Sequence, residues 1–316
     1  MGKKKKDTME LRFYEVPQGE YVLALLGDNW IRDYGHDESN LHFHNLMEIG
    51  YCKNGTGELI LNEDTKRYEP AMVSIIPQNY PHVTISDIAE GPSYWEYLFF
   101  DPMVMIQELY PDNAVMQKKV LQMINRKALF FHEWENRGIS VLVKMLMDEM
   151  RQKKNHFNDC VRGLLIAFFA ELLRMCESDV SENEVKKKTG VSQITAALDY
   201  VRLEYANNIR VEELAKASHM SETHFRRVFE SYMNMSPMDY INLMRVQKAC
   251  DIMKKTNDPM DVVAQKVGFT TTSTFNRNFR QLMGMSPAEW RKRPENYEQQ
   301  LLKFDIHSNI SALKGW

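Results

Sequence analysis

The C-terminal third of the chain contains an internal repeat, which constrains the fold more than any other feature of the sequence. Two segments correspond at an offset of 50 residues, Phe225-Arg226-Arg227-Val228-Phe229 and Phe275-Asn276-Arg277-Asn278-Phe279, and a Met-Ser-Pro sequence follows each. Upstream, between 214–215 and 263–264, the offset is 49 residues, so the second copy carries one extra residue. Such a repeat indicates one supersecondary unit that is used twice.

Each copy has the parts of a helix-turn-helix motif. A small residue, Ala215 or Ala264, lies on a short first helix where a second helix must cross closely; a tight turn and a second helix of about ten residues follow. In the second copy Gly268 stands where the first helix must end, a position that favours positive φ. In the first copy Ser221 can cap the second helix by accepting a hydrogen bond from a free amide.

The second helix of each copy predicts one buried and one exposed face. Phe225 and Phe229, like Phe275 and Phe279, are four residues apart and share a face that we expect to be buried. The residues between them must point to solvent or into a groove. The major groove of DNA admits one α-helix, and there arginine and asparagine form bidentate pairs with guanine and adenine. Because a matched arginine recurs at 227 and 277, we favour DNA reading over a solvated surface charge.

A longer helix is predicted between the two units. Ser236-Pro237 and Ser286-Pro287 each indicate a helix start, with a serine cap, proline at the first position and an acidic residue at the third. The first of these helices should run to about Lys254, a length of roughly 27 Å. Since successive major grooves on one face of DNA are about 34 Å apart, one chain can read adjacent turns of the duplex.

Charge is unevenly distributed along the chain. Residues 191–293 hold 15 lysines and arginines against 11 acidic residues, a net charge of +4, whereas the remainder carries −7. The positive surplus of this segment gives mild support for a polyanionic partner.

The segment from about Gln193 to Arg293 resembles the DNA-binding domain of the AraC/XylS family of transcription regulators. The resemblance rests on both units, on the connecting helix at 240–249 and on the sequence Gly284-Met285-Ser286-Pro287. It implies double-stranded DNA as a partner, and RNA polymerase as well if the protein is an activator. In the family the exposed residues of the two recognition helices contact bases, which implies this role for Thr223, Arg226, Arg227, Ser273, Asn276 and Arg277.

The N-terminal part has a different pattern. Short β-rich runs at 21–26, 57–61, 72–76 and 94–100 are typical of a small sandwich or barrel. Beyond Pro102 the apolar residues follow a helical period, and one stripe is wide: Phe157, Cys160, Val161, Leu164, Leu165, Phe168, Phe169, Leu172 and Leu173. Such a broad face predicts either a partner helix from a second chain or cover by an earlier helix at about 136–151. The sequence leaves both open.

Polar residues of the β-rich part resemble the pattern of a cupin barrel. Metal-binding cupins use a His-x-His pair, a glutamate and a distant histidine, which correspond here to His42, His44, Glu48 and His82. Imidazole and carboxylate suit iron, manganese, nickel or zinc. Regulators that resemble cupins have often lost the metal, so the resemblance implies a polar effector pocket formed by these four residues. We expect neither a metal nor another cofactor.

These observations predict an α+β multidomain chain. We expect a disordered basic tail at 1–9, a cupin-like β-barrel with a helical dimerisation segment at 10–177, a linker at 178–191, an all-α double helix-turn-helix domain at 192–293 and a C-terminal tail at 294–316. The sequence has neither the run of about 18 apolar residues that a membrane span needs nor a signal peptide, so we expect a cytoplasmic protein.

The expected function is sequence-specific DNA binding by a homodimeric transcription regulator, an activator gated by a small-molecule effector such as a sugar. We do not expect an enzyme. The main alternative is a metal-dependent cupin enzyme, such as an isomerase or dioxygenase, with an appended DNA-binding domain. A constitutive regulator with a purely dimerising barrel is a second alternative. A repair protein with a methyl-accepting cysteine is a third, against which the four scattered cysteines argue, since they form no zinc-like cluster.

Overall fold

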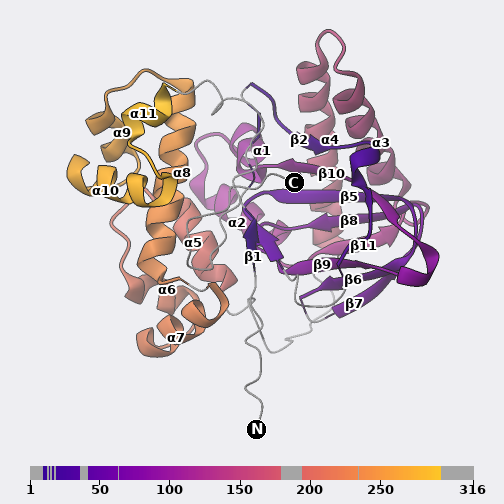
Figure 1. The fold of residues 1–316 in the computed structure, drawn as a ribbon, viewed down its shortest axis with the longest axis horizontal. Helices are drawn as coiled ribbons and strands as arrows, with labels where there is room; N and C mark the ends of the chain where they lie inside the picture. Colours follow the sequence, from indigo (N-terminus) through magenta and orange to yellow (C-terminus); the bar gives the residue numbers. More distant parts are fainter. Residues whose placement is uncertain are drawn as a thin grey trace. The chain divides into compact units, whose positions relative to one another are not determined.

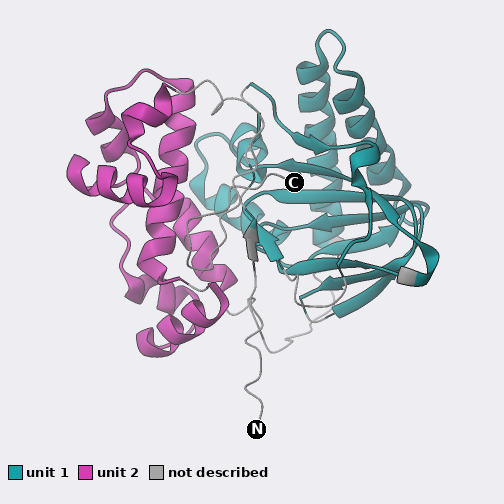
Figure 2. Cartoon of the chain, in the orientation of Figure 1, with its two compact units in different colours: residues 1–190, 301–305 teal, residues 191–300, 306–316 magenta. Residues whose placement is uncertain are grey.

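The computed structural model describes residues 10–12, 14, 16–17, 19–35, 42–62, 64–178, 194–233 and 235–292. The chain divides into two compact units, with the boundary between residues 190 and 191. Figure 2 shows the two units in different colours. The tails expected at 1–9 and 294–316 lie outside the described residues, as does the linker expected at 178–191 apart from its first residue.

Two β-sheets form the centre of the N-terminal unit (Figure 1). One has the strand order β1-β4-β9-β6-β7 and the other β11-β8-β5-β10-β2, with β3 also paired to β10. Neighbours are antiparallel except β1 and β4. The strands are β1 Glu10–Arg12, β2 Leu23–Leu25, β3 Ile31–Arg32, β4 His42–His44, β5 Met47–Asn54, β6 Gly57–Leu61, β7 Asp64–Tyr68, β8 Met72–Ile76, β9 His82–Ser86, β10 Ser93–Phe100 and β11 Leu129–His132.

Side chains from both sheets meet in one apolar core. Leu59 and Tyr68 come from the first sheet, and Ile76, Trp95 and Phe99 come from the second; all five are buried in the same cluster. Because side chains alternate across a strand, each sheet presents one face to this core. The four β-rich runs predicted from the sequence are therefore confirmed as strands of a double-sheeted fold.

Four helices come after β10, with β11 between the second and the third: α1 Pro102–Leu109, α2 Ala114–Ile124, α3 Arg137–Gln152 and α4 Phe157–Ser178. The wide apolar stripe lies on α4, where Val161, Leu165, Phe168, Phe169 and Leu172 are buried. Helix α3 lies along α4 (Figure 1) and buries a stripe of its own. The earlier helix thus covers part of the stripe, as one interpretation expected, and Phe100 of β10 packs against Phe168. The partner helix from a second chain stays a prediction.

The described residues of the C-terminal unit form helices joined by turns and short loops, with no strand among them. Its helices are α5 Thr195–Glu204, α6 Val211–Ala217, α7 Glu222–Met233, α8 Pro237–Lys255, α9 Met260–Lys266, α10 Thr272–Met283 and α11 Pro287–Arg291. Helix α8 starts at the predicted cap, where Ser236 Oγ accepts a hydrogen bond from the Asp239 amide at 3.2 Å. Ser286 does the same for Glu289 at 3.3 Å. The predicted α+β two-domain layout is confirmed.

Among the described residues, no helix is long and apolar enough to cross a lipid bilayer.

Candidate functional site

The two helix-turn-helix turns have the same backbone hydrogen bonds. The Met220 amide donates to the Ala215 carbonyl at 2.9 Å, and the Phe269 amide donates to the Ala264 carbonyl at 2.9 Å. The residue before each donor has positive φ, +56° at His219 and +89° at Gly268. This confirms the conformation predicted for Gly268 and shows that the first copy adopts it with a histidine, a residue tolerated there more often than most.

Each recognition helix begins at a hydroxyl cap. The His224 amide donates to Ser221 Oγ at 3.4 Å, and the Thr274 amide donates to Thr271 Oγ1 at 3.1 Å. The caps are 50 residues apart whereas the turns are 49 apart, so the extra residue of the second copy is Thr270, between turn and cap.

The six residues expected to contact bases are all exposed, while the phenylalanines at 225, 229, 275 and 279 are fully buried. The predicted division of α7 and α10 into two faces is therefore present. Arg226 pairs with Glu222 at 2.7 Å, and Arg227 Nη2 lies 3.1 Å from His224 Nδ1. The side chains of Asn276 and Arg277 make no hydrogen bond or ion pair with another described residue, so they need break no such contact to bind a partner.

The two recognition helices rest on different halves of α8. Phe229 of α7 contacts Tyr240, near the start of α8, with ring centroids 5.8 Å apart. Phe275 and Phe279 of α10 share a core with the later residues of α8, as far as Met253. Tyr240 and Met253 are 13 positions apart along the helix, a rise of about 20 Å. The long helix thus holds the two units apart, as predicted.

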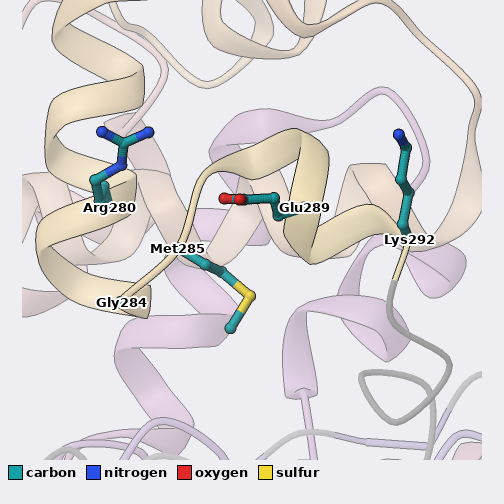
Figure 3. A pocket seen from close by; sticks show the side chains of 5 residues that line it. All are labelled: Arg280, Gly284, Met285, Glu289 and Lys292. Atoms are coloured by element: carbon teal, nitrogen blue, oxygen red, sulfur yellow. The ribbon is translucent and has the colours of Figure 1, made fainter.

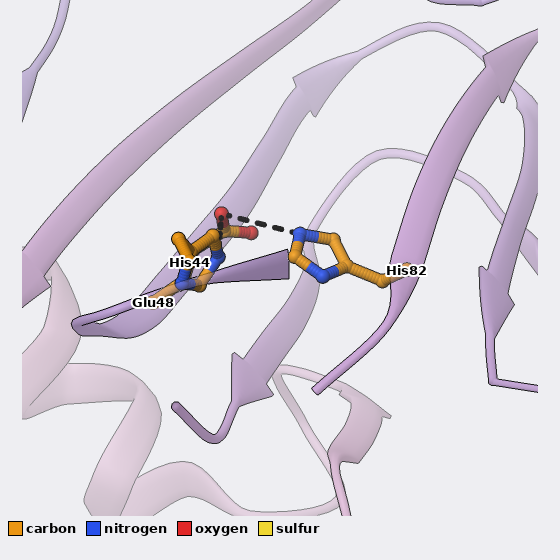
Figure 4. Close-up of side chains that lie close together, drawn as sticks. All are labelled: His44, Glu48 and His82. Atoms are coloured by element: carbon orange, nitrogen blue, oxygen red, sulfur yellow. Dashed lines mark hydrogen bonds and ion pairs between the residues drawn. The ribbon is translucent and has the colours of Figure 1, made fainter. Parts of the chain in front are cut away.

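The four polar residues expected to line the barrel are all buried, and three of them converge. His44 Nε2 lies 3.1 Å from Glu48 Oε2, and His82 Nε2 lies 3.5 Å from the same oxygen (Figure 4). His42 is not part of this triad, because its Nε2 lies 3.2 Å from Arg12 Nη1 on the neighbouring strand β1. The structure therefore brings the ligand atoms of His44, Glu48 and His82 together, while His42 lies beside the triad, with its ring centroid 4.3 Å from that of His82.

The electrostatics of the triad call for a positive charge. His44 Nδ1 lies 2.7 Å from the Leu46 carbonyl and His82 Nδ1 lies 2.9 Å from the Tyr80 carbonyl, so both Nδ1 atoms are placed to donate. Each Nε2 atom then points its lone pair at the Glu48 carboxylate, which is also an acceptor. A proton or a metal ion between these three acceptor atoms removes their mutual repulsion.

Burial and the neighbouring groups shift the pKa values within the triad. Burial lowers the pKa of His44, although the Glu48 carboxylate raises it. Burial alone would raise the pKa of Glu48, but the imidazoles of His82 and His44 outweigh it and lower that pKa to about 2. The triad therefore presents an ionised carboxylate.

The triad fits a transition-metal ion. Two ligands about 2.1 Å from an ion lie roughly 3.0–3.4 Å apart at octahedral or tetrahedral angles, close to the 3.1 and 3.5 Å between these nitrogen and oxygen atoms. Two histidines and one carboxylate also form a known set for non-haem iron. The expectation of a metal-free pocket stays a prediction.

Comparison with known proteins identifies the C-terminal architecture. Residues 214–293 match the family model described as a helix-turn-helix domain. The C-terminal domain is therefore a helix-turn-helix domain of the AraC type. The chain is a DNA-binding regulator, as the resemblance of its two units implied.

Similar proteins extend over most of the regulator. YdeC of Bacillus subtilis, named as an HTH-type transcriptional regulator, is 23% identical over 291 residues, which cover 91% of this chain and 96% of YdeC. RafR of Pediococcus pentosaceus, named as the raffinose operon regulatory protein, is 23% identical over 77% of this chain and 84% of its own. A crystal structure of fatty-acid-bound ToxT from Vibrio cholerae is 16% identical, covers 88% of this chain and 96% of its own, and has a TM-score of 0.39.

A polar hollow lies where α10 meets α11 in the regulator (Figure 3). Arg280, Gly284, Met285, Glu289 and Lys292 line it, and it is open to solvent. Glu289 also accepts a hydrogen bond from the Ser286 amide at 2.8 Å as part of the α11 cap. The lining thus combines two cations with one carboxylate at an open surface.

Sequence reasoning missed two arginines of the regulator. Arg12 faces His42 only because β1 pairs with β4, a contact between residues 30 apart that no local pattern signals. Arg245 is 9% exposed, and its position between apolar residues in Leu243-Met244-Arg245-Val246 was an available signal of burial.

Proposed function

We propose that the regulator reads one DNA site with both recognition helices, through Thr223, Arg226, Arg227, Ser273, Asn276 and Arg277. The observation that carries this proposal is the matched exposure of Arg227 and Arg277 on helices whose opposite faces are buried. Arginine suits guanine and asparagine suits adenine. The separate support of α7 and α10 by the two halves of α8 favours simultaneous contact with neighbouring turns of the major groove.

Selection from random duplexes tests this proposal. The full-length protein should enrich a sequence with two conserved blocks about 10 base pairs apart, centre to centre, because each recognition helix occupies one turn of the groove. The selection should be run at moderate salt, since low salt favours contacts to phosphates regardless of sequence. Recovery of duplexes with no common sequence would contradict the proposal.

We further propose that the regulator is an activator gated by a small polar effector bound in the N-terminal barrel, near His42, His44, Glu48 and His82. The support is the convergence of the buried polar side chains of His44, Glu48 and His82 beside the apolar core of the double sheet. The name of the similar RafR points to the sugar class. Effector binding would change DNA affinity or the contact with RNA polymerase through a coupling of about 1–3 kcal/mol.

A thermal-shift screen with sugars and other polar metabolites tests the effector. A ligand at 100 times its Kd should stabilise the barrel by about 2.7 kcal/mol. For a unit of this size that corresponds to a rise in Tm of roughly 5–10 °C. Glu48→Gln should reduce the shift for the true effector, because it removes the carboxylate charge at nearly constant volume. If DNA binding proves constant whatever compound is added, the constitutive regulator is favoured instead.

We propose that the regulator acts in the cytoplasm as a homodimer in which a second copy covers part of α3. Val141 and Met145 lie one helical turn apart and are 50% and 48% exposed, and Trp134 just before α3 is 63% exposed. Large apolar side chains grouped in this way favour a protein contact. Light scattering of the purified protein, which gives its molar mass in solution, tests this.

A second candidate function is favoured by the triad of His44, Glu48 and His82, which could make the barrel a metal-dependent enzyme or a metal-anchored effector site. Within the described residues, these three form the group whose ligand atoms all lie within 4.8 Å of one another. A bound ion would polarise a carbonyl or hydroxyl oxygen of a small molecule.

Metal analysis of purified variants separates the metal-bound from the metal-free barrel. If the triad holds an ion, the wild type should contain about one iron, manganese, nickel or zinc per chain, and His44→Ala and His82→Ala should each lose it. His42→Ala is the matched control: its ring lies 4.3 Å from that of His82, but its Nε2 lies 3.2 Å from Arg12 and it is outside the group of converging ligand atoms, so this variant should keep the ion. A wild type that stays metal-free after incubation with these ions, as the sequence predicts, would exclude this candidate.

A further inference from the structure

Arg245 lies buried in the middle of α8 and is held by backbone carbonyls. Its Nε donates to the Tyr205 carbonyl at 2.8 Å, and its Nη2 donates to the Asn207 carbonyl at 2.9 Å. These carbonyls belong to the end of α5 and the segment that leads to α6 of the first helix-turn-helix unit. The carbonyls at a helix C-terminus lack partners within the helix and carry partial negative charge, so a buried guanidinium satisfies them.

The second helix-turn-helix unit contacts the same segment from another side. Arg245 Cζ lies 5.6 Å from the ring centroid of Phe269, the residue that ends the second turn. Gly268 approaches the segment so closely that an added Cβ would lie 2.7 Å from the carbonyl oxygens of both Tyr205 and Ala206. Tyr205 itself packs against the core of the second unit. Arg245, a residue of α8, thus contacts both the segment that leads from α5 to α6 of the first helix-turn-helix unit and the turn of the second unit.

We propose that Arg245 is the positioning residue that fixes the spacing of the two recognition helices, and with it the spacing of the two DNA half-sites that the regulator accepts. This rests on the DNA reading by both helices proposed above. If α8 were the sole connection between the two helix-turn-helix units, each unit could tilt relative to the half of α8 on which it packs. The junction of Arg245, Gly268 and Phe269 adds a direct link between the units, which removes that freedom.

The dependence of DNA binding on half-site spacing measures how rigidly this junction holds the two recognition helices. Inserting one base pair moves one half-site by about 3.4 Å along the axis and rotates it by roughly 35°. A rigid pair of recognition helices cannot follow both changes, whereas a loosened pair follows them at lower cost. The spacing preference of the protein therefore reports on the junction independently of its overall affinity.

The test measures Kd for the full-length protein on its selected duplex and on duplexes with one base pair added or removed between the half-sites. Wild type should bind the altered duplexes about 30-fold more weakly, as expected for losing the specific contacts of one base pair or more. Arg245→Met keeps most of the side-chain volume and should reduce this ratio to about threefold. Arg245→Lys keeps the charge and one donor and should give an intermediate ratio.

Leu198→Ala is the control for lost stability alone, because Leu198 is buried in α5 and lies outside the core cluster that holds Phe269 and packs against Tyr205. It should lower Tm and affinity while leaving the spacing ratio at its wild-type value. A wild-type ratio in both Arg245 variants would overturn the proposal and leave Arg245 a purely structural residue; if Arg245→Met does not fold, Arg245→Lys alone decides. A wild type without any sequence preference would instead contradict the DNA-reading proposal.

Discussion

Replacing Arg227 and Arg277 together by alanine is expected to weaken binding to the selected DNA site by about 2–6 kcal/mol, because each arginine–guanine pair contributes about 1–3 kcal/mol of discrimination. Each single variant should lose about half of this and relax the base preference at one position. The two arginines lie on helices supported by opposite halves of α8, so their losses should add to within about 0.5 kcal/mol. Competition binding against the selected duplex and a scrambled duplex measures both quantities.

The pattern of losses tells which contacts the arginines make. A double variant no weaker than Arg277→Ala would mean that the second unit reads DNA without the first. An equal loss on selected and scrambled duplexes would make Arg277 a phosphate contact instead. Lys255→Ala serves as the control for charge alone, because Lys255 is exposed at the end of α8 and outside both recognition helices. It should leave the ratio between the two duplexes unchanged.

Gly268→Ala is expected to lower the free energy of unfolding of the C-terminal unit by about 2–5 kcal/mol. Alanine in the left-handed region costs about 1–2 kcal/mol. The new Cβ would also meet the carbonyl oxygens of Tyr205 and Ala206 at 2.7 Å, and overpacking of this kind costs about 1–3 kcal/mol more. Scanning calorimetry of the full-length protein, which follows the transition of this unit, measures the loss.

Gly284→Ala is the matched control for backbone strain alone. Gly284 has a φ of +71°, but an added Cβ there would meet nothing within 4 Å. Its substitution should therefore cost only about 1–2 kcal/mol. Equal losses in the two variants would show that the segment at 205–206 can move away from the turn.

Local sequence patterns predicted the features of the regulator that depend on neighbours in the chain. The serine–proline starts of α8 and α11, the positive φ at Gly268 and the buried phenylalanines of α7 and α10 all follow from spacing within about one helical turn or from a single cap, and the structure confirms them. The same patterns repeated along the chain also predicted the two helix-turn-helix units.

Contacts between distant residues were beyond these patterns. The spacing of His42 and His44 suggested one shared site, but the pairing of β1 with β4 brings Arg12 to His42 and leaves a triad without it. The stripe on α4 gave no sign of how much of it α3 covers. Arg245 joins three segments that are up to 64 residues apart in the chain, from Tyr205 to Phe269, and only the fold brings them together.

The single extra residue, Thr270, makes the two helix-turn-helix units of the C-terminal unit non-equivalent. With a longer turn, α10 leaves its partner helix one residue later than α7 does, and it offers Asn276 where α7 offers Arg226. The two recognition helices therefore differ in their exposed side chains. If both bind DNA as proposed, one chain would recognise an asymmetric DNA site rather than a palindromic one. Inverting such a DNA site in a promoter would reverse the orientation of the bound protein, so that a different side of the protein would face the transcription start.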